Sequence, residues 1–197
     1  MTNIGLTPRD VARELARRYS TMTHDELDIL EGILVPMKFQ KGEYILREGE
    51  VCKNIFWIVK GLVRQFYHKN GKELTEYMAT ENTICMAIES LFHEEPSKQQ
   101  IVALEPTIIY ALPKAALEQE AIKNVNIQMR YRNILEESGI NSQKHARKLR
   151  FESAQDRYAK LVKESPQLVL RAPLVYIASY LQMTPETLSR VRTSALL

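Results

Sequence analysis

The segment between residues 33 and 112 consists of short apolar or alternating runs that are separated by turn residues. The runs cover residues 33–39, 44–47, 55–60, 62–68, 74–79, 100–103 and 108–112, and the breaks include Lys41-Gly42, Glu48-Gly49, Lys60-Gly61 and Asn70-Gly71. Asn70-Gly71 is the strongest hairpin signal, because a type I′ turn requires positive φ at both central residues. Short strands at this spacing, joined by glycine-containing turns, predict a β-sandwich or barrel.

The sequence before this segment predicts helices. Residues 7–20 are expected to form the first helix, with Thr7 as its cap and Pro8 at its first position. A second, shorter helix is expected to begin at Thr23.

After the last run, the pattern is helical to the end of the chain. We expect helices at residues 113–121, 124–150 and 153–163. Asn124 caps the long helix, and Gly139 in its middle indicates either the close approach of another helix or a kink. The dipeptides Ser165-Pro166 and Ala172-Pro173 bracket a connector.

The composition excludes several classes of protein. The 197 residues are 45% hydrophobic and 26% charged, as in an ordinary globular protein, and no run approaches the roughly 20 apolar residues of a membrane span. No secretory signal is evident at the N-terminus. Cys52 and Cys85 are too few for a disulfide framework or a four-cysteine iron–sulfur site, so we expect reduced core thiols and no cofactor. We therefore expect a cytoplasmic protein.

Charge is unevenly distributed along the chain. Residues 1–123 contain 15 Lys+Arg and 18 Asp+Glu, a net charge of −3, whereas residues 124–197 contain 12 and 6, a net charge of +6. A basic C-terminal third indicates either a partner that carries phosphates or an ordinary solvated helical surface.

Residues 174–192 contain two short apolar patterns separated by a turn. The first pattern is a stripe of Leu174, Ile177, Ala178 and Leu181. Gln182-Met183 then forms a turn, Thr184 is a strong N-cap, and Pro185 fits the first helical position. Two short helices with such a turn match a helix-turn-helix, in which the second helix enters the major groove of DNA.

The second of these helices has an apolar inner side and a polar outer side. Leu188 and Val191 face inward, and the candidates for DNA contact are Thr184, Glu186, Thr187, Ser189, Arg190 and Arg192. Arginine can donate two hydrogen bonds to guanine, glutamate can accept one from cytosine, and small hydroxyls suit phosphates. A helical hairpin with a merely solvated outer face is the alternative, but this combination of side chains favours DNA.

The motif at residues 177–190 resembles the recognition motif of CRP/FNR transcription regulators. The resemblance implies that Glu186, Ser189 and Arg190 recognise a DNA half-site. The family often has arginine before the glutamate, where this sequence has Pro185, so we expect one contact fewer.

Two further departures from the family pattern concern the turn and the end of the chain. The turn glycine of the family is replaced by Gln182, and a left-handed non-glycine residue costs roughly 1 kcal/mol. Five residues follow Arg192, so we expect no wing after the second helix and modest DNA affinity.

The resemblance extends upstream to residues 41–49, 55–64 and 70–73, which are similar to the strands of a cyclic-nucleotide-binding-like jelly roll. It covers roughly residues 25–192 and implies an α+β fold with a double-stranded β-helix, or jelly roll. The domains it implies are a sensor domain at residues 1–123, a dimerisation helix at 124–150 and a helix-turn-helix DNA-binding domain at 151–197.

The residues that would bind a cyclic nucleotide depart from the family. Members that bind cyclic AMP have a Gly-Glu pair and, further on, an arginine followed by Ser or Thr. Here Glu89 is one residue out of register, and Ser97 takes the place of the arginine, beside Lys98. A buried phosphate without its bidentate arginine loses its strongest partner. With Glu89, Ser97 and Lys98 as candidate pocket residues, we expect an unknown small-molecule effector other than cyclic AMP, or none.

The resemblance also implies partners. A homodimer would pair the long helices, with Ile127, Tyr131 and Ile134 as candidates for the seam; alternatively, this face packs on the protein's own jelly roll. A two-fold dimer places its recognition helices about 34 Å apart and predicts a pseudo-palindromic site. The expected partners are double-stranded DNA, a second copy of the chain and RNA polymerase, but no membrane.

The main alternative from another class is a cupin-type metalloenzyme. Such an enzyme needs clustered metal ligands, whereas the histidines at positions 24, 68, 93 and 145 are far apart, and the sequence has no glycine-rich phosphate loop and no nucleophile elbow. We therefore expect no catalytic residues, no metal site and no enzyme activity. A signalling module that senses a ligand and binds a protein instead of DNA is a further alternative.

Overall fold

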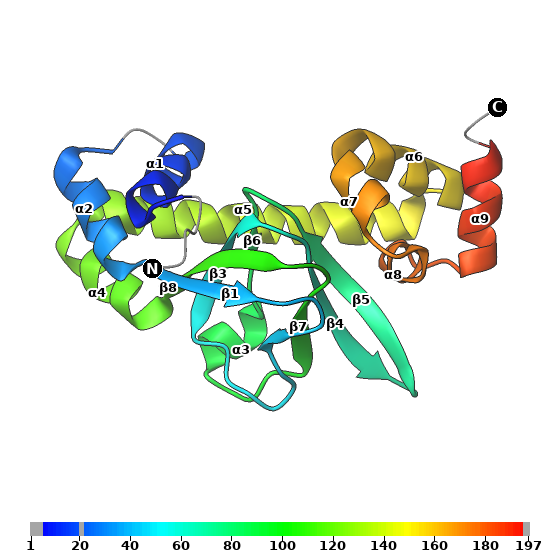
Figure 1. The fold of residues 1–197 in the computed structure, drawn as a ribbon, viewed down its shortest axis with the longest axis horizontal. Coiled ribbons are helices and arrows are strands. Elements are labelled where there is room, and N and C mark those ends of the chain that lie inside the picture. Colours follow the sequence, from blue (N-terminus) through cyan, green and yellow to red (C-terminus); the bar gives the residue numbers. More distant parts are fainter. Residues whose placement is uncertain (1–5, 20–21, 195–197) are drawn as a thin grey trace.

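The short runs form a β-sandwich in the computed structural model, which describes residues 6–19 and 22–194 (Figure 1). Its two antiparallel sheets have the strand orders β1-β8-β3-β6 and β2-β7-β4-β5. The strands are β1 Val35–Phe39, β2 Tyr44–Leu46, β3 Asn54–Lys60, β4 Val63–Lys69, β5 Lys72–Ala79, β6 Ile84–Cys85, β7 Gln99–Ala103 and β8 Thr107–Pro113. The α+β fold with an N-terminal jelly roll is confirmed. Strand β6 and helix α3 (Ile88–His93) were not predicted from the runs, because each is too short to show a period.

Two turns depend on positive φ angles. Asn70 and Gly71, between β4 and β5, have φ angles of 53° and 73°, as a type I′ hairpin requires. Gly61 has a φ of 113°, and a Cβ there would lie 2.4 Å from Oγ1 of Thr107. Only glycine therefore fits at the β3–β4 corner.

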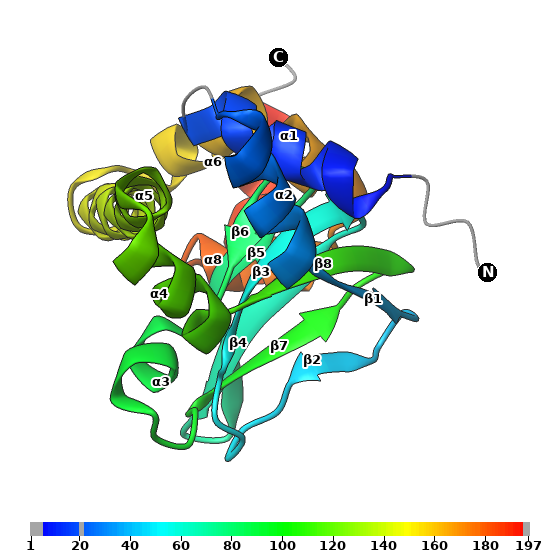
Figure 2. The same ribbon diagram turned by 90° about the vertical axis from the view of Figure 1, so that its left-hand side faces the viewer.

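Helices α1 (Pro8–Tyr19) and α2 (His24–Ile33) pack together over the sandwich, next to the long helix (Figure 2). Oγ1 of Thr23 accepts the N–H of Glu26 at 3.3 Å, and the Glu26 carboxylate accepts the N–H of Thr23 at 2.9 Å. This reciprocal capping box satisfies two backbone donors and confirms the start of the second helix.

Helix α4 (Lys114–Lys123) leads into the long helix α5 (Val125–Phe151). Oδ1 of Asn124 caps α5 by accepting two backbone N–H groups, as predicted. The helix continues through Gly139, and no neighbouring atom lies within 4 Å of the position that a Cβ would take there. Of the two alternatives for Gly139, the close approach of another helix is therefore not present within the described residues.

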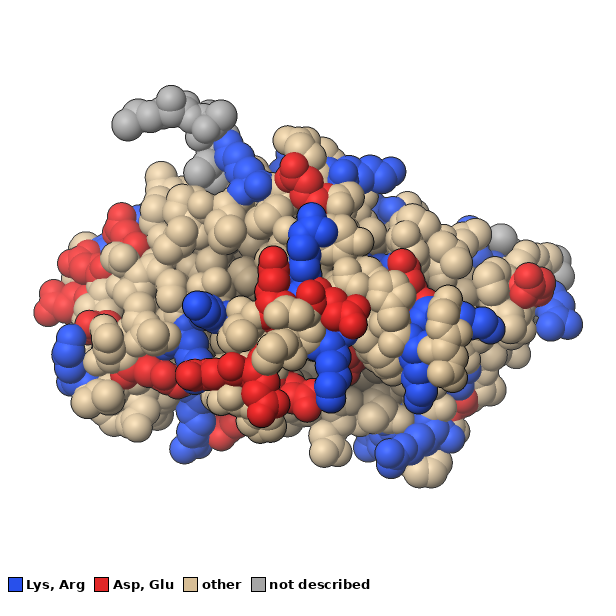
Figure 3. All heavy atoms as spheres, turned by 90° about the horizontal axis from the view of Figure 1, so that it is seen from below, with Lys and Arg blue, Asp and Glu red and all other residues tan. Residues whose placement is uncertain are grey.

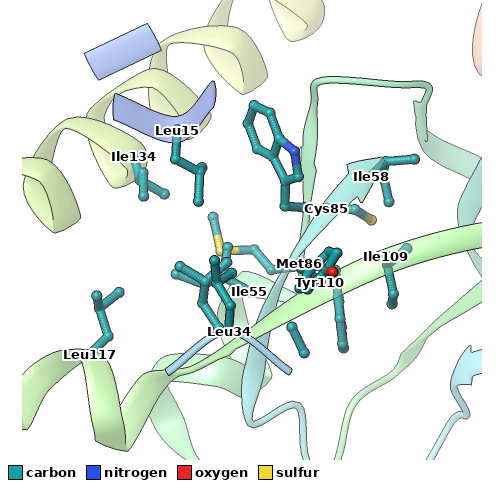
Figure 4. Packing of buried hydrophobic residues seen from close by; sticks show 14 of the residues in the cluster. Leu15, Leu34, Ile55, Ile58, Cys85, Met86, Ile109, Tyr110, Leu117 and Ile134 are labelled. Atoms are coloured by element: carbon teal, nitrogen blue, oxygen red, sulfur yellow. The ribbon is translucent and has the colours of Figure 1, made fainter. Parts of the chain in front are cut away.

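The main core lies between the two sheets and extends to the helices that cover them. Figure 4 shows Leu15 of α1, Leu117 of α4 and Ile134 of α5 converging on Ile55 and other strand residues. Cys52 and Cys85 are both buried free thiols, as expected. Burial raises the pKa of both thiols, which keeps them protonated.

The C-terminal helices form a second core. They are α6 Ala154–Glu164, α7 Pro166–Arg171, α8 Leu174–Tyr180 and α9 Pro185–Ser194. The connector expected between the two proline dipeptides is in fact helix α7, in which Leu168 is buried. The second core also includes Leu62 and Met78 of the jelly roll, so the helical domain rests on the sandwich.

The predicted domain boundaries at residues 123 and 150 lie close to the ends of α5. Parts of the two outer predicted domains lie outside the described residues, namely residues 1–5, 20–21 and 195–197. Most of the five residues that follow Arg192 are among them. Among the helices that the structure describes, none has the length and apolar character needed to span a membrane.

Candidate nucleic-acid interface

The turn between α8 and α9 is built as the sequence predicts. Gln182 has a φ of 49°, and the N–H of Met183 donates to the carbonyl of Ala178 at 2.9 Å. The left-handed conformation of a non-glycine residue at this position is therefore confirmed. The packing of the surrounding helices compensates for its unfavourable backbone energy.

Buried residues fix the two helices relative to each other. Ile177 and Ala178 of α8 and Leu188 of α9 are fully buried, together with Tyr158 and Leu161 of α6. The small side chain of Ala178 suits the crossing of the helices, as predicted. Leu174 is 41% exposed, so the buried stripe of α8 is shorter than the sequence indicates.

Thr184 caps α9 as predicted. Its Oγ1 accepts the N–H of Thr187 at 3.2 Å, and its carbonyl accepts the N–H of Leu188 at 2.9 Å. The hydroxyl of Thr187 lies 3.2 Å from that of Thr184 and 3.5 Å from a guanidinium nitrogen of Arg190. The cap therefore helps to set the position of one candidate arginine.

The outer side of α9 is polar and open to solvent. Glu186, Ser189 and Arg190 are exposed, while Thr187 and Arg192 are partly buried. The backbone N–H at Glu186, the Thr184 hydroxyl and the Arg190 charge together hold the pKa of the Glu186 carboxyl below its usual value. An ionised carboxylate and a guanidinium thus face outward from the first turns of one helix, which suits donors and acceptors on base edges.

Charge on the rest of the surface is mixed. Figure 3 shows acidic and basic side chains lying beside one another over the jelly roll, with further basic side chains towards the helix-turn-helix end. In the described residues no three side chains are placed to bind a metal ion.

The candidate effector residues occupy three different settings. Glu89 is exposed in the first turn of α3, and Lys98 is exposed in the loop before β7. Ser97 is buried, and its hydroxyl donates to the carbonyl of Gln99, the first residue of β7, at 2.9 Å. The Ser97 hydroxyl is therefore already engaged.

A polar cluster that the sequence did not indicate lies nearby. Nε2 of Gln65 donates to Oε1 of Gln99 at 2.7 Å, and the Cys85 thiol donates to Oε1 of Gln65 at 3.3 Å. Burial and the charge of Glu89 raise the pKa of the Glu76 carboxyl, which accepts from Gln99. The negative charges of Glu76 and Glu89 therefore disfavour binding of an anionic ligand, such as a cyclic phosphate, beside these residues.

The residues expected at the dimer seam face inward. Ile127 and Ile134 are 0% and 5% exposed within the main core, and Tyr131 packs against it and donates to Glu118 at 3.3 Å. Ile127 and Ile134 are therefore taken up by the core of their own protomer, which favours the alternative that this face packs internally, and the dimer seam itself stays a prediction.

A second apolar stripe lies on the opposite side of α5. Val125, Met129, Ile140 and Phe151 are 65%, 55%, 53% and 80% exposed. At 3.6 residues per turn, they lie within about 80° of one another around the helix axis. We call these four residues the outer stripe; the sequence reasoning missed it because it considered only one face.

The jelly roll is similar to a known domain family. Residues 36–124 match the family model of the cyclic nucleotide-binding domain, which covers the sandwich and α4. No curated protein matches the sequence.

Solved structures extend the likeness to the helical domain. FixK2 from Bradyrhizobium japonicum is similar with a TM-score of 0.72 and 19% identity, over 82% of this chain and 84% of that one. The catabolite activator protein of Thermus thermophilus has a TM-score of 0.56 and 20% identity, over 92% and 85%. A Eubacterium rectale protein described as a transcriptional regulator of the CRP/FNR family has a TM-score of 0.66 and 15% identity, over 88% and 83%.

The chain therefore carries a jelly roll of the cyclic nucleotide-binding kind. As a whole it has the two-domain fold of CRP/FNR regulators, and the resemblance that its sequence indicates is confirmed.

Proposed function

We propose that this protein is a dimeric, sequence-specific DNA-binding transcription regulator of the CRP/FNR type. The observation that carries the proposal is the outer side of α9, where Glu186, Ser189 and Arg190 are exposed on a helix anchored by the fully buried Leu188. A rigid helix with this polar face is what base contact in the major groove requires.

The outer stripe of α5 is the proposed dimer seam. Val125, Met129, Ile140 and Phe151 are too exposed and too regularly spaced to be left in water without cost. Pairing the stripe with that of a second copy would create a two-fold axis along α5. The two α9 helices would then face half-sites about 34 Å apart on one side of the DNA.

The regulator would act in the cytoplasm with RNA polymerase as a further partner and without enzymatic activity. Its effector would be a small molecule other than cyclic AMP, or it would need none. The settings of the three candidate residues support this part of the proposal, because Ser97 and Glu89 carry no positive charge and Lys98 is an exposed point charge that cannot replace a buried bidentate arginine.

The test is selection of bound duplexes from a random pool with the purified protein. We expect an enriched inverted repeat whose half-sites are one DNA turn apart. Arg190→Ala should remove the enrichment, whereas Arg13→Ala, which removes an exposed arginine of α1, should keep it. Weak, salt-sensitive binding without any enriched sequence, with or without cell extract as a source of effector, would contradict the proposal.

A further inference from the structure

The second half of α5 contacts the helix-turn-helix through a stack of two aromatic rings. The imidazole of His145 in α5 lies 4.4 Å from the ring of Tyr180 in α8, measured between the ring centres, and the two ring planes are 11° apart. Both side chains are partly buried. Since α8 is the first helix of the helix-turn-helix, the stack helps to hold that motif on the long helix.

The connection between α5 and the helical domain is short. Helix α5 ends at Phe151 and α6 begins at Ala154, so residues 152 and 153 form all of it. A few residues at the end of a helix can serve as a hinge, because changes in their φ and ψ angles turn whole domains. Side-chain contacts across the connection, such as the stack, therefore help to fix the orientation of the helix-turn-helix.

Positive charges act on the imidazole of His145 from two helices. Burial, followed by the charges of Lys148 on α5 and Arg157 on α6, lowers the pKa of His145 below its ordinary value of 6.5. The carboxylate of Glu164 on α6 forms an ion pair with Lys148, so most of its negative charge is already balanced. The closed contact therefore contains a neutral imidazole at neutral pH.

The groups on the other side of the stack do not supply a compensating negative charge. Burial and the charge of Glu164 raise the pKa of Tyr180 to about 12. Burial also raises the pKa of Tyr77 in β5, which lies close enough to Tyr180 for their charges to interact. Both phenols are thus uncharged at neutral pH. The face of the Tyr180 ring attracts a cation, but lost hydration and two nearby positive charges outweigh that attraction.

We propose that His145 makes the placement of the helix-turn-helix sensitive to pH. A neutral imidazole keeps the stack closed, whereas protonation adds a third positive charge beside Lys148 and Arg157 and loosens α8 from α5. The use of this switch in transcription rests on the proposed function. The switch itself is a property of the protein without DNA, so the two proposals can fail separately.

The link between protonation and opening gives the direction of the effect. A histidine whose pKa is lowered in the closed arrangement binds a proton more readily when the contact is open, so a fall in pH favours opening. The effect begins near the ordinary pKa of 6.5 and is absent well above it. If the closed arrangement excluded the proton completely, the open population would increase about tenfold between about pH 7.5 and pH 5.5.

Hydrogen exchange at the Thr75 amide measures the opening, because this N–H donates to Oγ of Ser179 in α8 at 2.9 Å. After correction for the intrinsic pH dependence of exchange, we expect protection of Thr75 to fall about three- to tenfold between about pH 7.5 and pH 5.5. The Ile101 amide, in the main core, should stay protected. His145→Phe keeps a flat ring that does not titrate, and it should show high protection of Thr75 at both pH values.

Two further variants bracket this result. His145→Arg carries a permanent positive charge and should give the low protection of Thr75 already at about pH 7.5. His93→Phe removes an exposed histidine from α3 and should keep the wild-type response. The proposal is overturned if protection of Thr75 does not change with pH, or if His145→Phe shows the same fall as the wild type. Parallel loss of protection at Thr75 and Ile101 would mean that the whole protein opens in acid, and it would overturn the proposal too.

A titration of the wild-type protein tests the same point without any substitution. The imidazole signal of His145 in the nuclear magnetic resonance spectrum should change with a midpoint below the ordinary pKa of 6.5. A midpoint at or above that value would show that the closed contact accepts the proton, and the switch would have no driving force.

Discussion

The recognition helix and the effector region differ in how their candidate residues are held. In α9, Glu186, Ser189 and Arg190 lie within two turns of one helix and are exposed together. In the jelly roll, Glu89 and Lys98 are exposed on separate segments, and the hydroxyl of Ser97 is engaged with the carbonyl of Gln99. The first set therefore forms one surface, whereas the members of the second set are held separately.

A surface on one helix and a pocket between strands depend on the fold in different ways. A helix places residues three or four positions apart on one face, so the recognition surface persists wherever the helix is buried on its other side. A pocket depends on side chains from several strands, so one change of register or charge can remove it. The helix-turn-helix is thus the part of this chain that best supports the proposed function.

The largest expected effect is on the packing that holds α9 in place. Leu188→Ala should lower the stability of the helical domain by about 2–5 kcal/mol, because truncation of the fully buried side chain leaves a cavity. Denaturant unfolding followed by hydrogen exchange should show α6–α9 opening before the sandwich. The control is Leu174→Ala, which alters a leucine that is 41% exposed, and equal losses for both would refute the packing described.

The next effect concerns base recognition. Glu186→Ala should reduce discrimination at one base pair of each half-site by about 1–3 kcal/mol and leave the other positions intact. Competition binding with single-base variants of the selected duplex measures this. Glu89→Ala removes another exposed carboxylate, from the effector region, and should not alter base preference. If both variants showed the same change of base preference, the preference would depend on the net charge of the protein and not on a contact between Glu186 and a base.

Local signals made much of the fold predictable. Asn70-Gly71 specified a hairpin, and Thr23 and Asn124 specified helix starts. Each of these features depends on residues within a few positions of one another. Backbone φ preferences and capping hydrogen bonds are therefore enough to predict them.

The faces of α5 were not predictable in the same way. Both Ile127 with Ile134 and Met129 with Ile140 are apolar pairs on α5, so the sequence alone does not tell which pair meets the core. Contacts between residues that are far apart in the sequence could not be predicted either. Nothing local links Arg64 to Tyr176, whose pairing exists only because α8 packs on the hairpin.

The strained turn gives a smaller prediction. Gln182→Gly should stabilise the helical domain by up to about 1 kcal/mol, because glycine adopts a positive φ without strain. Gln143→Gly, the same substitution in the exposed interior of α5, should instead destabilise by about 1 kcal/mol. Thermal unfolding of the two variants should therefore shift in opposite directions, and a shared direction would contradict the assigned turn geometry.

A pH effect should arise where α5 meets α8. The ring of His145 stacks on Tyr180 at 4.4 Å, and burial, with the charges of Lys148 and Arg157, lowers the pKa of His145 from its usual value. As pH falls below the ordinary pKa of histidine, the unfolded chain takes up a proton that the folded protein resists, so stability decreases; above it, this contribution does not change. His145→Phe keeps a stacked ring and should reduce the loss of stability between about pH 7 and pH 5, measured by denaturant titration. An unchanged slope in the variant would exclude His145 as the source.

The last prediction concerns the effector region, where cyclic AMP should have no effect. Cyclic AMP at about 1 mM should release no saturable heat in calorimetry and should not raise the melting temperature, because a ligand that binds only the folded state would raise it. The reason is that Lys98, the cation among the candidate residues, is exposed to solvent, the Ser97 hydroxyl is engaged with Gln99, and burial together with the charge of Glu89 raises the pKa of the Glu76 carboxyl. Cyclic GMP serves as the control for general nucleotide binding. Saturable binding of cyclic AMP alone would mean that the pocket is assembled by residues other than those the family uses, and the contrast between an intact recognition helix and a lost effector site would no longer hold.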